Sequence, residues 1–501
     1  MANVTIFVAN TWIKINTFKF SVIAGSNIDL RVFIGRKLTE WDLDRRTQRW
    51  HVRYQYLIYN RDERALYLPR YYLEPLKSFI VESDPDTHIR EILVEPIRPK
   101  RMRLNLSEGY APRNEKQEHL IEFMTDKHEF FKPVSAQTGI GKTFCAEASI
   151  CKLGYNAIIV LNSLIDQWEA SILEQTDATP DDVYKVQGYP SLEKLWRKYA
   201  AEKYRPKIIL FATKTLQSYA VDPQGPYASL PSYDNFIKHF GIGVKVVDEC
   251  HNGFHGTVQI DLASNIKHSI YLSATYSRTD PKGREIFNTV FPESMRFGGQ
   301  FVEKYTRVYM ASYGCIPTYN EWVFKVAQGY NHSKYETYLL KYPEYQKQLF
   351  DNVLYVIINE YFIRTRKEGQ KLLILCLTRN YAVDIAYRIV EKFPEFSVGT
   401  YFSGDKINDD ENPLDADIVV STTKSASTGL DIKYLKTAIN TVSFSSEVLA
   451  SQSMGRLRRL PGEETIFVDI FNRNLRSHIR HKDERIRAYS TKALSIDCVH
   501  L

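Results

Sequence analysis

Two glycines, a lysine and a threonine lie close together in AQTGIGKT, the segment Ala136–Thr143. The segment fits the pattern Ala/Gly-x-x-x-x-Gly-Lys-Ser/Thr, with a probable strand before it and a helical pattern, FCAEASICKL, after it. In such a loop the glycines let backbone N–H groups turn toward a β-phosphate, the lysine reaches the β- and γ-phosphate oxygens, and the threonine offers a hydroxyl to Mg²⁺. A turn with an incidental Gly-Lys-Thr is the disfavoured alternative. The predicted nucleotide-binding residues of this loop are Gln137, Thr138, Gly139, Ile140, Gly141, Lys142 and Thr143.

Two adjacent carboxylates, Asp248 and Glu249, follow the apolar run GVKVV further along the chain. A carboxylate at the end of a strand can hold the water shell of a metal ion, and its neighbour can orient or deprotonate an attacking water. We therefore predict that Thr143 and Asp248 coordinate Mg²⁺ beside ATP. Cys250 and His251 come next, but no companion ligands occur at zinc-like spacing, so we expect no zinc site.

The elements around these residues alternate between short apolar runs and helical patterns. FFKPVSAQ, AIIVLN, KIILFAT, GVKVVDEC and SIYLSAT form one series, and YTRVYMAS, KLLILCLT, FSVGTYFSG, ADIVVSTT, TAINTVSFS and TIFVDIF form a second. Buried strands that alternate with helices indicate parallel sheets with crossover helices. A mostly helical, tyrosine-rich stretch is expected at 320–366. KDERIRAYSTKALSI (482–496) has helical spacing and is expected to pack on the body of the protein.

The N-terminal region has a different pattern. Residues 1–95 alternate apolar and polar side chains before the helical run LEPLKSFIVES, and a basic, proline-punctuated linker is expected at 95–113. Basic and aromatic residues interleave in RRTQRWHVRYQYLIYNRDERALYLPRYY (45–72), and residues 1–110 hold 18 basic against 13 acidic residues. This composition suits base stacking and phosphate contact. A β-meander with solvated arginines on its outer face explains it equally well.

Composition limits the class of protein. The 501 residues carry a net charge of +7, with 44% hydrophobic and 25% charged residues, which are globular values. No apolar run approaches the length of a membrane span, and MANVTIFVANTWIKIN lacks the features of a secretion signal. The six cysteines are scattered, which suits a reducing compartment. We expect a cytoplasmic protein, in the host cytoplasm if it is phage-encoded, that does not bind a membrane.

Over residues 110–475 the sequence resembles the superfamily 2 helicases and translocases. AQTGIGKT and DECH are similar to motifs I and II of that superfamily, and eight further segments resemble its other motifs in order. These segments are PRNEKQEHLI (112–121, the adenine-reading Q motif), VLNSLIDQW (160–168, motif Ia), FATKTLQ (211–217, the next strand-contacting motif), LSATYSRTD (272–280, motif III), LLILCLTRN (372–380, motif IV), YFSGD (401–405, the short motif after it), VVSTTKSASTGLDI (419–432, motif V) and SQSMGRLRR (451–459, motif VI).

The resemblance implies roles for individual residues. Arg456 and Arg459, three apart on an expected helix, would face the γ-phosphate as arginine fingers from a second domain. The catalytic set is then Lys142, Asp248, Glu249, Arg456 and Arg459. Further nucleotide contacts are Arg113, Gln117, Gly429, Asp431 and Gln452; residues that couple ATP to movement are His251, Ser273, Ala274 and Thr275; and DNA contacts are Asn162, Ser163, Thr213, Thr378, Arg379, Ser403, Gly404 and Thr422.

The run 31–80 is similar to the small N-terminal domain of phage UvsW-type branch-migration helicases, with a Trp-Asp turn, a strand that ends in Tyr-Asn-Arg and a Leu-Pro helix start. The resemblance implies an α/β protein with two RecA-like parallel-sheet domains in tandem and a small α+β N-terminal accessory domain. Its expected parts are an accessory domain for duplex or branched DNA (1–105), two RecA-like domains (106–300 and 301–475) and a C-terminal helix (476–501).

By this resemblance the protein is an ATP-dependent DNA helicase that remodels forks, junctions or displacement loops, moving 3′ to 5′. DECH in place of DEAD favours DNA, and motif Ia lacks its usual proline and threonine. Three alternatives are weighed: the motor subunit of a restriction-type complex, an RNA helicase, and a nucleic-acid-binding protein with a decayed ATPase core. Retention of the catalytic set argues against the last.

Overall fold

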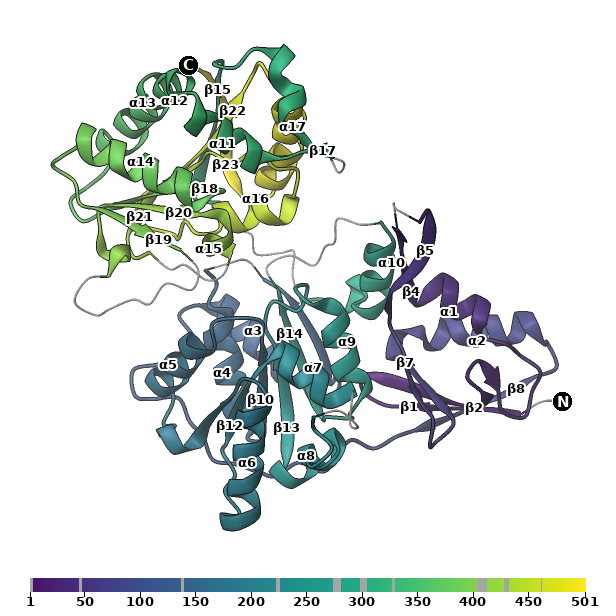
Figure 1. Cartoon of the computed structure of the whole chain (residues 1–501). Coiled ribbons are helices and arrows are strands. Elements are labelled where there is room, and N and C mark those ends of the chain that lie inside the picture. Colours follow the sequence, from purple (N-terminus) through teal and green to yellow (C-terminus); the bar gives the residue numbers. More distant parts are fainter. Residues whose placement is uncertain are drawn as a thin grey trace. The chain divides into compact units, whose positions relative to one another are not determined.

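The computed structural model describes residues 3–44, 47–136, 139–221, 226–273, 281–297, 304–326, 329–402, 412–427, 432–460 and 462–501. The chain divides into two compact units (Figure 1). The first holds Met1–Ala136 and Ile140–Gly299, and the second holds Gln300–Leu501 with the short segment Gln137–Gly139.

The first unit begins with a small α+β domain, as expected. Its main sheet has the order β6-β7-β2-β1-β8, in which β1 runs parallel to β8 and antiparallel to β2. The elements are β1 (Asn3–Val8), β2 (Trp12–Lys19), β3 (Val22–Ile23), α1 (Arg31–Lys37), β4 (Thr39–Asp44), β5 (Arg49–Gln55), β6 (Ile58–Asn60), β7 (Ala65–Pro69), α2 (Leu73–Ser83) and β8 (His88–Leu93). Among these, β4 and β5 pair with each other in a separate two-stranded sheet.

An α/β domain follows within the same unit. Six strands run parallel in the order β11-β12-β10-β13-β14-β9. They are β9 (Phe131–Ser135), β10 (Asn156–Leu161), β11 (Val183–Val186), β12 (Ile208–Ala212), β13 (Ile242–Val247) and β14 (His268–Ser273). The helices are α3 (Glu115–Thr125), α4 (Lys142–Leu153), α5 (Ile165–Gln175), α6 (Tyr189–Glu202), α7 (Thr213–Val221), α8 (Tyr233–Phe240), α9 (Phe254–Leu262) and α10 (Pro281–Val290).

The second unit is also an α/β domain. Its seven strands run parallel in the order β19-β20-β18-β21-β22-β15-β23. They are β15 (Thr306–Tyr313), β18 (Lys371–Cys376), β19 (Val398–Tyr401), β20 (Ile418–Thr422), β21 (Leu435–Asn440), β22 (Thr465–Asn472) and β23 (Ala493–His500), with a short hairpin of β16 (Lys325–Val326) and β17 (Gly329–Tyr330). The helices are α11 (His332–Lys341), α12 (Pro343–Leu349), α13 (Tyr355–Ile358), α14 (Arg379–Lys392), α15 (Thr423–Ser427), α16 (Glu447–Met454) and α17 (Arg476–Ser490).

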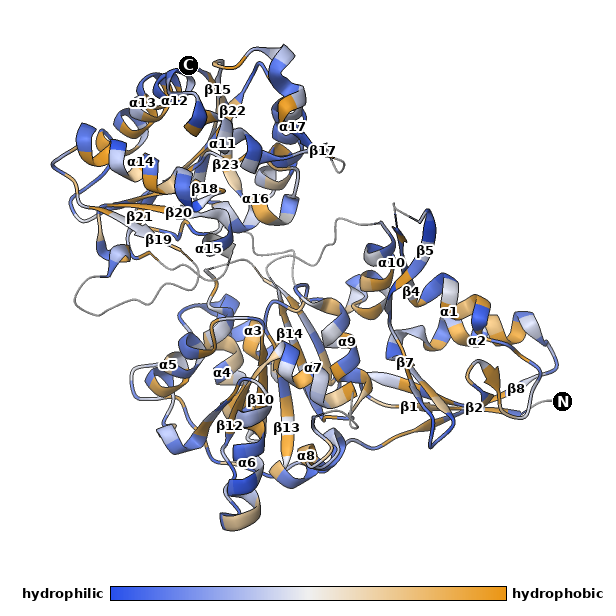
Figure 2. Ribbon diagram, in the orientation of Figure 1, coloured by the Kyte–Doolittle hydropathy of each residue, from blue (hydrophilic) through white to orange (hydrophobic). Residues whose placement is uncertain are grey.

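Two RecA-like parallel-sheet domains and a small N-terminal domain are thus confirmed. Several strands predicted from apolar runs are buried on both faces: every residue of β10, β13 and β14 is buried, and Figure 2 draws β10 and β13 largely in orange. Crossover helices on both sides of a parallel sheet require such continuous apolar strands. The mostly helical stretch at 320–366 is confirmed as well.

One sequence-based expectation needs correction. The C-terminal segment is not a helix throughout, because α17 ends at Ser490 and β23 then pairs in parallel with β15 inside the second sheet. The segment 95–113 has no regular structure, as expected of a linker, and it is held in place by backbone hydrogen bonds: Lys100 N–H donates to the carbonyl of Gly241, and Met102 N–H donates to that of Gly154. The local sequence pattern revealed neither the pairing of β23 with β15 nor these hydrogen bonds, because the partners lie far away in the sequence.

The N-terminal domain is fixed to the α/β domain of the first unit. Asn10 donates through its amide to the carbonyl oxygens of Ile266 (3.3 Å) and Lys267 (3.0 Å), and the Trp12 indole donates to Ser264 O (3.2 Å). A single apolar core runs through both domains. Buried hydrogen bonds of this kind require a defined docking geometry, because a shift would leave polar groups unsatisfied.

Candidate nucleotide site

The predicted phosphate-binding loop lies between the end of β9 and the start of α4. Gly139 and Gly141 have φ values of +93° and +86°, a region that favours glycine, and Gly141 is the N-cap of α4. Lys142 Nζ donates to the carbonyl of Ala136 (2.9 Å), so its ammonium group lies back across the loop at the strand end. Thr143 is the second residue of α4. Gln137 and Thr138, also predicted here, lie outside the described residues.

Gln117 is bound to this loop. Its Nε2 donates to the carbonyl of Ile140 (2.7 Å), and its Oε1 accepts from the N–H of Arg113 (2.8 Å). Gln117 is 3% exposed, and a Cβ at Gly141 would lie 2.5 Å from its Nε2. The Asn114 side chain caps α3 by accepting from Gln117 N–H. The two segments that the sequence assigned to base and phosphate recognition therefore meet through one buried amide, whereas a contact of Gln117 with adenine stays a prediction.

Asp248 lies at the carboxyl end of β13. Its Oδ2 accepts from the indole N–H of Trp168 (3.1 Å), and its Oδ1 accepts from the backbone N–H of Glu249 (3.0 Å). Burial, followed by the charge of Glu249, raises the pKa of Asp248 to about 6, against the opposing effect of the nearby Lys142 ammonium. A cation beside a carboxylate in such surroundings stabilises its charged form.

Glu249 has a backbone φ of +46°, which is uncommon for a residue other than glycine. Backbone strain of this kind persists where the surrounding structure imposes it, and it is concentrated at functional sites. The turn places His251 Nδ1 at 3.2 Å from Glu249 Oε2 and at 2.8 Å from Ser273 Oγ, at the end of β14. The predicted coupling residues His251 and Ser273 are therefore in contact. Ala274 and Thr275 lie outside the described residues.

The predicted DNA contacts of the first unit are divided between surface and core. Asn162 and Ser163 are exposed after β10, and Asn162 Nδ2 donates to the carbonyl of Asn252 (2.8 Å), four residues beyond Asp248. Thr213, the first residue of α7, is buried with 6% exposure, so its hydroxyl does not lie at the surface.

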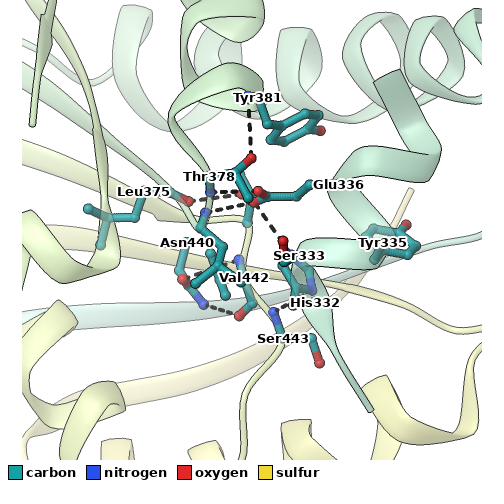
Figure 3. Close-up of polar contacts among 12 residues, drawn as sticks. His332, Ser333, Tyr335, Glu336, Leu375, Thr378, Tyr381, Asn440, Val442 and Ser443 are labelled. Atoms are coloured by element: carbon teal, nitrogen blue, oxygen red, sulfur yellow. Dashed lines mark hydrogen bonds and ion pairs between the residues drawn. The ribbon is translucent and has the colours of Figure 1, made fainter. Parts of the chain in front are cut away.

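Motif IV of the second unit is held by a buried carboxylate that the sequence analysis missed. Glu336 on α11 accepts from the backbone N–H groups of Leu377 and Thr378, both at 2.7 Å. Figure 3 shows this carboxyl group against Thr378, at the start of α14. Burial raises the pKa of Glu336 to about 7, and hydrogen bonds from Thr378 and Leu377 oppose the rise. Next to this anchored turn, Arg379 is exposed with its guanidinium 5.0 Å from the ring centre of Phe402.

A second buried network holds the loop before motif VI. Arg485 on α17 donates to Asp469 on β22 through Nε (2.7 Å) and Nη2 (2.9 Å), and through Nη1 to the carbonyl of Phe444 (3.0 Å). Ser443 N–H donates to His332 Nδ1 (3.3 Å). Because α16 begins at Glu447, these contacts fix the entry to the helix of motif VI.

The expected helix around Arg456 and Arg459 is wrong. Helix α16 ends at Met454, so Arg456 lies in a turn and Arg459 in an irregular segment. Gly455, the C-cap of the helix, has a φ of −68° and not the left-handed conformation of many helix-ending glycines. Gln452 lies on α16 with 8% exposure, and Thr422 is buried, with its hydroxyl 2.9 Å from Ser425 Oγ. Four further predicted residues lie outside the described residues: Ser403, Gly404, Gly429 and Asp431.

Comparisons with known proteins fit this geometry. Residues 110–278 match the family model described as Type III restriction enzyme, res subunit (ResIII). This segment spans the phosphate loop, the Asp-Glu pair and Ser273. Together with the two parallel sheets, the match supports an ATPase of the superfamily 2 helicase type. No match was found among curated proteins.

Several solved structures are similar at low identity. Dbp5 of S. cerevisiae bound to RNA and ADP BeF3 is 14% identical, with 77% of this chain and 89% of that chain covered and a TM-score of 0.49. The ATP-dependent Type ISP restriction-modification enzyme LlaBIII bound to DNA is 11% identical, with coverages of 85% and 34% and a TM-score of 0.48. The Hef helicase domain of Pyrococcus furiosus is 15% identical, with coverages of 74% and 97% and a TM-score of 0.44. At these values the likeness says nothing of substrate.

Two further observations concern membranes and metals. Across the described ranges, no helix combines the length and apolar character that crossing a bilayer requires. In the same part of the chain, no three His, Cys, Asp or Glu side chains gather where they could hold a metal ion.

Proposed function

We propose that the chain is an ATP-driven DNA helicase or translocase that remodels branched DNA, such as forks, junctions and displacement loops. The single observation that carries the proposal is the convergence of Lys142, Asp248 and Glu249 at the carboxyl edge of one parallel sheet, with His251 contacting Ser273. This edge is where open α/β sheets bind their ligands. Movement 3′ to 5′, the UvsW-type branch and a place in replication, recombination or repair follow from the sequence resemblance.

Each residue then has a task in hydrolysis. Lys142 holds the β- and γ-phosphates, and Glu249 orients the attacking water beside the strained turn. The hydroxyl of Thr143 and the carboxylate of Asp248 are oxygen donors of the kind that Mg²⁺ prefers, and the ion would neutralise phosphate charge when bound with ATP. Arg456 and Arg459 of the second unit supply positive charge during hydrolysis. Their irregular backbone, rather than a rigid helix face, leaves them able to adjust when nucleotide binds.

The proposed nucleic-acid contacts are likewise assigned from residue type and position. Asn162 and Ser163 of the first unit and Arg379 of the second are exposed polar residues beside loops held by hydrogen bonds. Contacts to phosphate position a strand without reading its sequence. The N-terminal domain, docked on the first α/β domain, would then hold duplex DNA. With DNA as its partner and no membrane association, the protein would act in the cytoplasm, or in the host cytoplasm if it is phage-encoded.

A second candidate is the motor of a restriction-type complex, which the ResIII match to residues 110–278 favours. In that case the same ATPase would serve a nuclease partner. Co-purification with a nuclease, and DNA cleavage that needs both proteins and ATP, would establish this function instead.

The proposal is tested by ATP hydrolysis and strand displacement with the full chain. We expect single-stranded DNA to stimulate hydrolysis more than RNA of the same length, and forked or four-way DNA to be processed faster than plain tailed duplex. Lys142→Ala is expected to abolish hydrolysis, because the phosphates lose their positive contact. Near-normal turnover in that variant would remove the phosphate-loop assignment, and stimulation by RNA alone would make the protein an RNA helicase.

A further inference from the structure

Strands β4 and β5 form an arm that extends from the N-terminal domain (Figure 1). The arm is stiffened at its turn, where Asp44 Oδ2 accepts from the hydroxyl of Thr47 (2.8 Å) and Gln48 takes up a φ of +53°. All five residues 49–53 of β5 are exposed, so both faces of the ribbon meet solvent. The arginines of β5 are solvated, as the β-meander alternative supposes, although residues 49–53 have no packed face.

One face of the arm is apolar. Directly paired residues of two antiparallel strands project to the same face, and the register pairs Trp41 with Val52 and Leu43 with Trp50. Trp50, near the turn, is 67% exposed, and Trp41 is 48% exposed. The Trp41 indole donates to the carbonyl of Gly35 on α1 (3.3 Å), which fixes the ring nearer the base of the arm.

The rest of the arm is charged, with four arginines and three acidic residues in the sequence 39–55. Arg49 and His51 lie on the opposite face, where they pair across the strands with two aspartates, and the exposed Arg53 lies at the register shift near the base of the arm. In the sequence, Arg45 and Arg46 stand between the two strands. Figure 2 accordingly draws most of β5 in blue. Aromatic rings bordered by guanidinium groups are the combination that binds nucleobases and their phosphates, because each base offers a face for stacking.

The base of the arm is fixed to the helix that follows motif II. Gln259 on α9 donates to the carbonyls of Gln55 (3.0 Å) and Leu57 (3.2 Å). His255, one turn earlier on α9, stacks on Tyr54 with ring centres 4.7 Å apart. An isolated two-stranded hairpin is marginal in water, so these contacts give the arm its orientation.

We propose that the β4–β5 arm stacks its exposed tryptophans on the bases at the point where a DNA duplex opens, while its arginines contact the flanking phosphates. The inference rests on the proposed function as a DNA motor, which it deepens by naming the duplex–single-strand junction as the feature bound. The arm would hold the separated end against the domain that hydrolyses ATP.

The test measures junction binding directly, without ATP. The probe is a tailed DNA duplex with 2-aminopurine at the first unpaired position, titrated with the full-length protein. We expect the wild type to quench the fluorophore, and Trp50→Ala to bind with a Kd raised about 5- to 150-fold, which corresponds to the range for loss of one base–aromatic stack. Trp50→Phe keeps a stacking ring and is expected to recover most of the affinity.

A matched control is Trp322→Ala, because Trp322 is 73% exposed but lies in the second unit. Equal quenching and equal Kd in wild type and Trp50→Ala, with the same unfolding temperature, would overturn the proposal and leave the arm as a contact for another protein. ATP hydrolysis is measured on the same samples. Absence of DNA-stimulated hydrolysis in the wild type would contradict the proposed motor function. The fluorescence titration tests only the proposed role of the arm in binding the junction.

Discussion

The indole of Trp168 offers a sharp test of how Asp248 is positioned. Its N–H donates to Asp248 Oδ2 at 3.1 Å, and the side chain is only 2% exposed. Trp168→Phe removes the donor and keeps an aromatic ring in the same slot. A hydrogen bond to a charged group contributes about 1.5–3 kcal/mol, which converts to a factor of roughly 10–150 in an equilibrium constant.

We expect this loss to appear as weaker Mg²⁺ binding, since the carboxylate that would hold the ion is no longer oriented. The assay is DNA-stimulated ATP hydrolysis as a function of Mg²⁺ concentration at fixed ATP. In Trp168→Phe, the half-maximal rate should require at least about tenfold more Mg²⁺ than in the wild type. At saturating Mg²⁺ the rate should recover in large part.

Trp196→Phe is the matched control, because Trp196 lies in the same α/β domain and stacks on Tyr199 with ring centres 5.0 Å apart, away from Asp248. A Mg²⁺ requirement in Trp168→Phe equal to that of the wild type, in a protein that folds normally, would refute the orienting role. An equal change in both variants would point to a general loss of packing.

Three further predictions concern single side chains. Glu249→Gln should retain ATP binding but lose hydrolysis by about 10²-fold or more, as expected for loss of a general base or water-orienting group; an unchanged kcat would contradict that role. Because burial raises the pKa of Glu336 to about 7 from an ordinary 4.5, its contribution to stability is complete below pH 4.5 and is lost as the pH rises through 7. The advantage of the wild type over Glu336→Gln in thermal unfolding should therefore shrink between pH 5 and 8, and a constant difference would refute the assignment. Asp469→Ala leaves the buried charge of Arg485 unpaired, which should cost about 3–5 kcal/mol and lower the unfolding temperature of the second unit by several degrees; a shift below a degree would show that water or another group replaces the carboxylate.

Much of this architecture could be predicted from local sequence. Continuous apolar runs such as NAIIVL, bounded by helical patterns, identify strands buried on both faces, and the structure bears them out. The glycines of the predicted phosphate loop also carried a local signal: Gly139 and Gly141 were expected to let the backbone turn, and both adopt a positive φ. Where backbone geometry and burial are set by neighbours in the chain, the sequence is a sufficient guide.

Contacts between distant segments left no such signal. Trp168 appeared only as the last residue of a segment similar to motif Ia, and nothing local indicates that its indole meets Asp248 on another strand. Glu336 lies in a tyrosine-rich stretch that contains no recognisable motif, yet it anchors the turn at Thr378. The strand β23 was mistaken for helix because ALSIDCVH was considered apart from the edge of the sheet that it completes.

Helix α9 relates the ATP site to the arm. It begins at Phe254, a few residues after Asp248, and a buried contact of Asp261 with Lys245 ties it back to β13, the strand that carries Asp248. Gln259, between these points, holds the base of the β4–β5 arm. These polar contacts tie α9 to both the strand that carries Asp248 and the base of the arm, and breaking either would leave buried polar groups unsatisfied. Removal of residues 1–105 would expose the apolar core that the N-terminal domain shares with the α/β domain, rather than simply delete an accessory function. Point substitutions such as Trp50→Ala are therefore the informative way to separate the role of the arm from that of the motor.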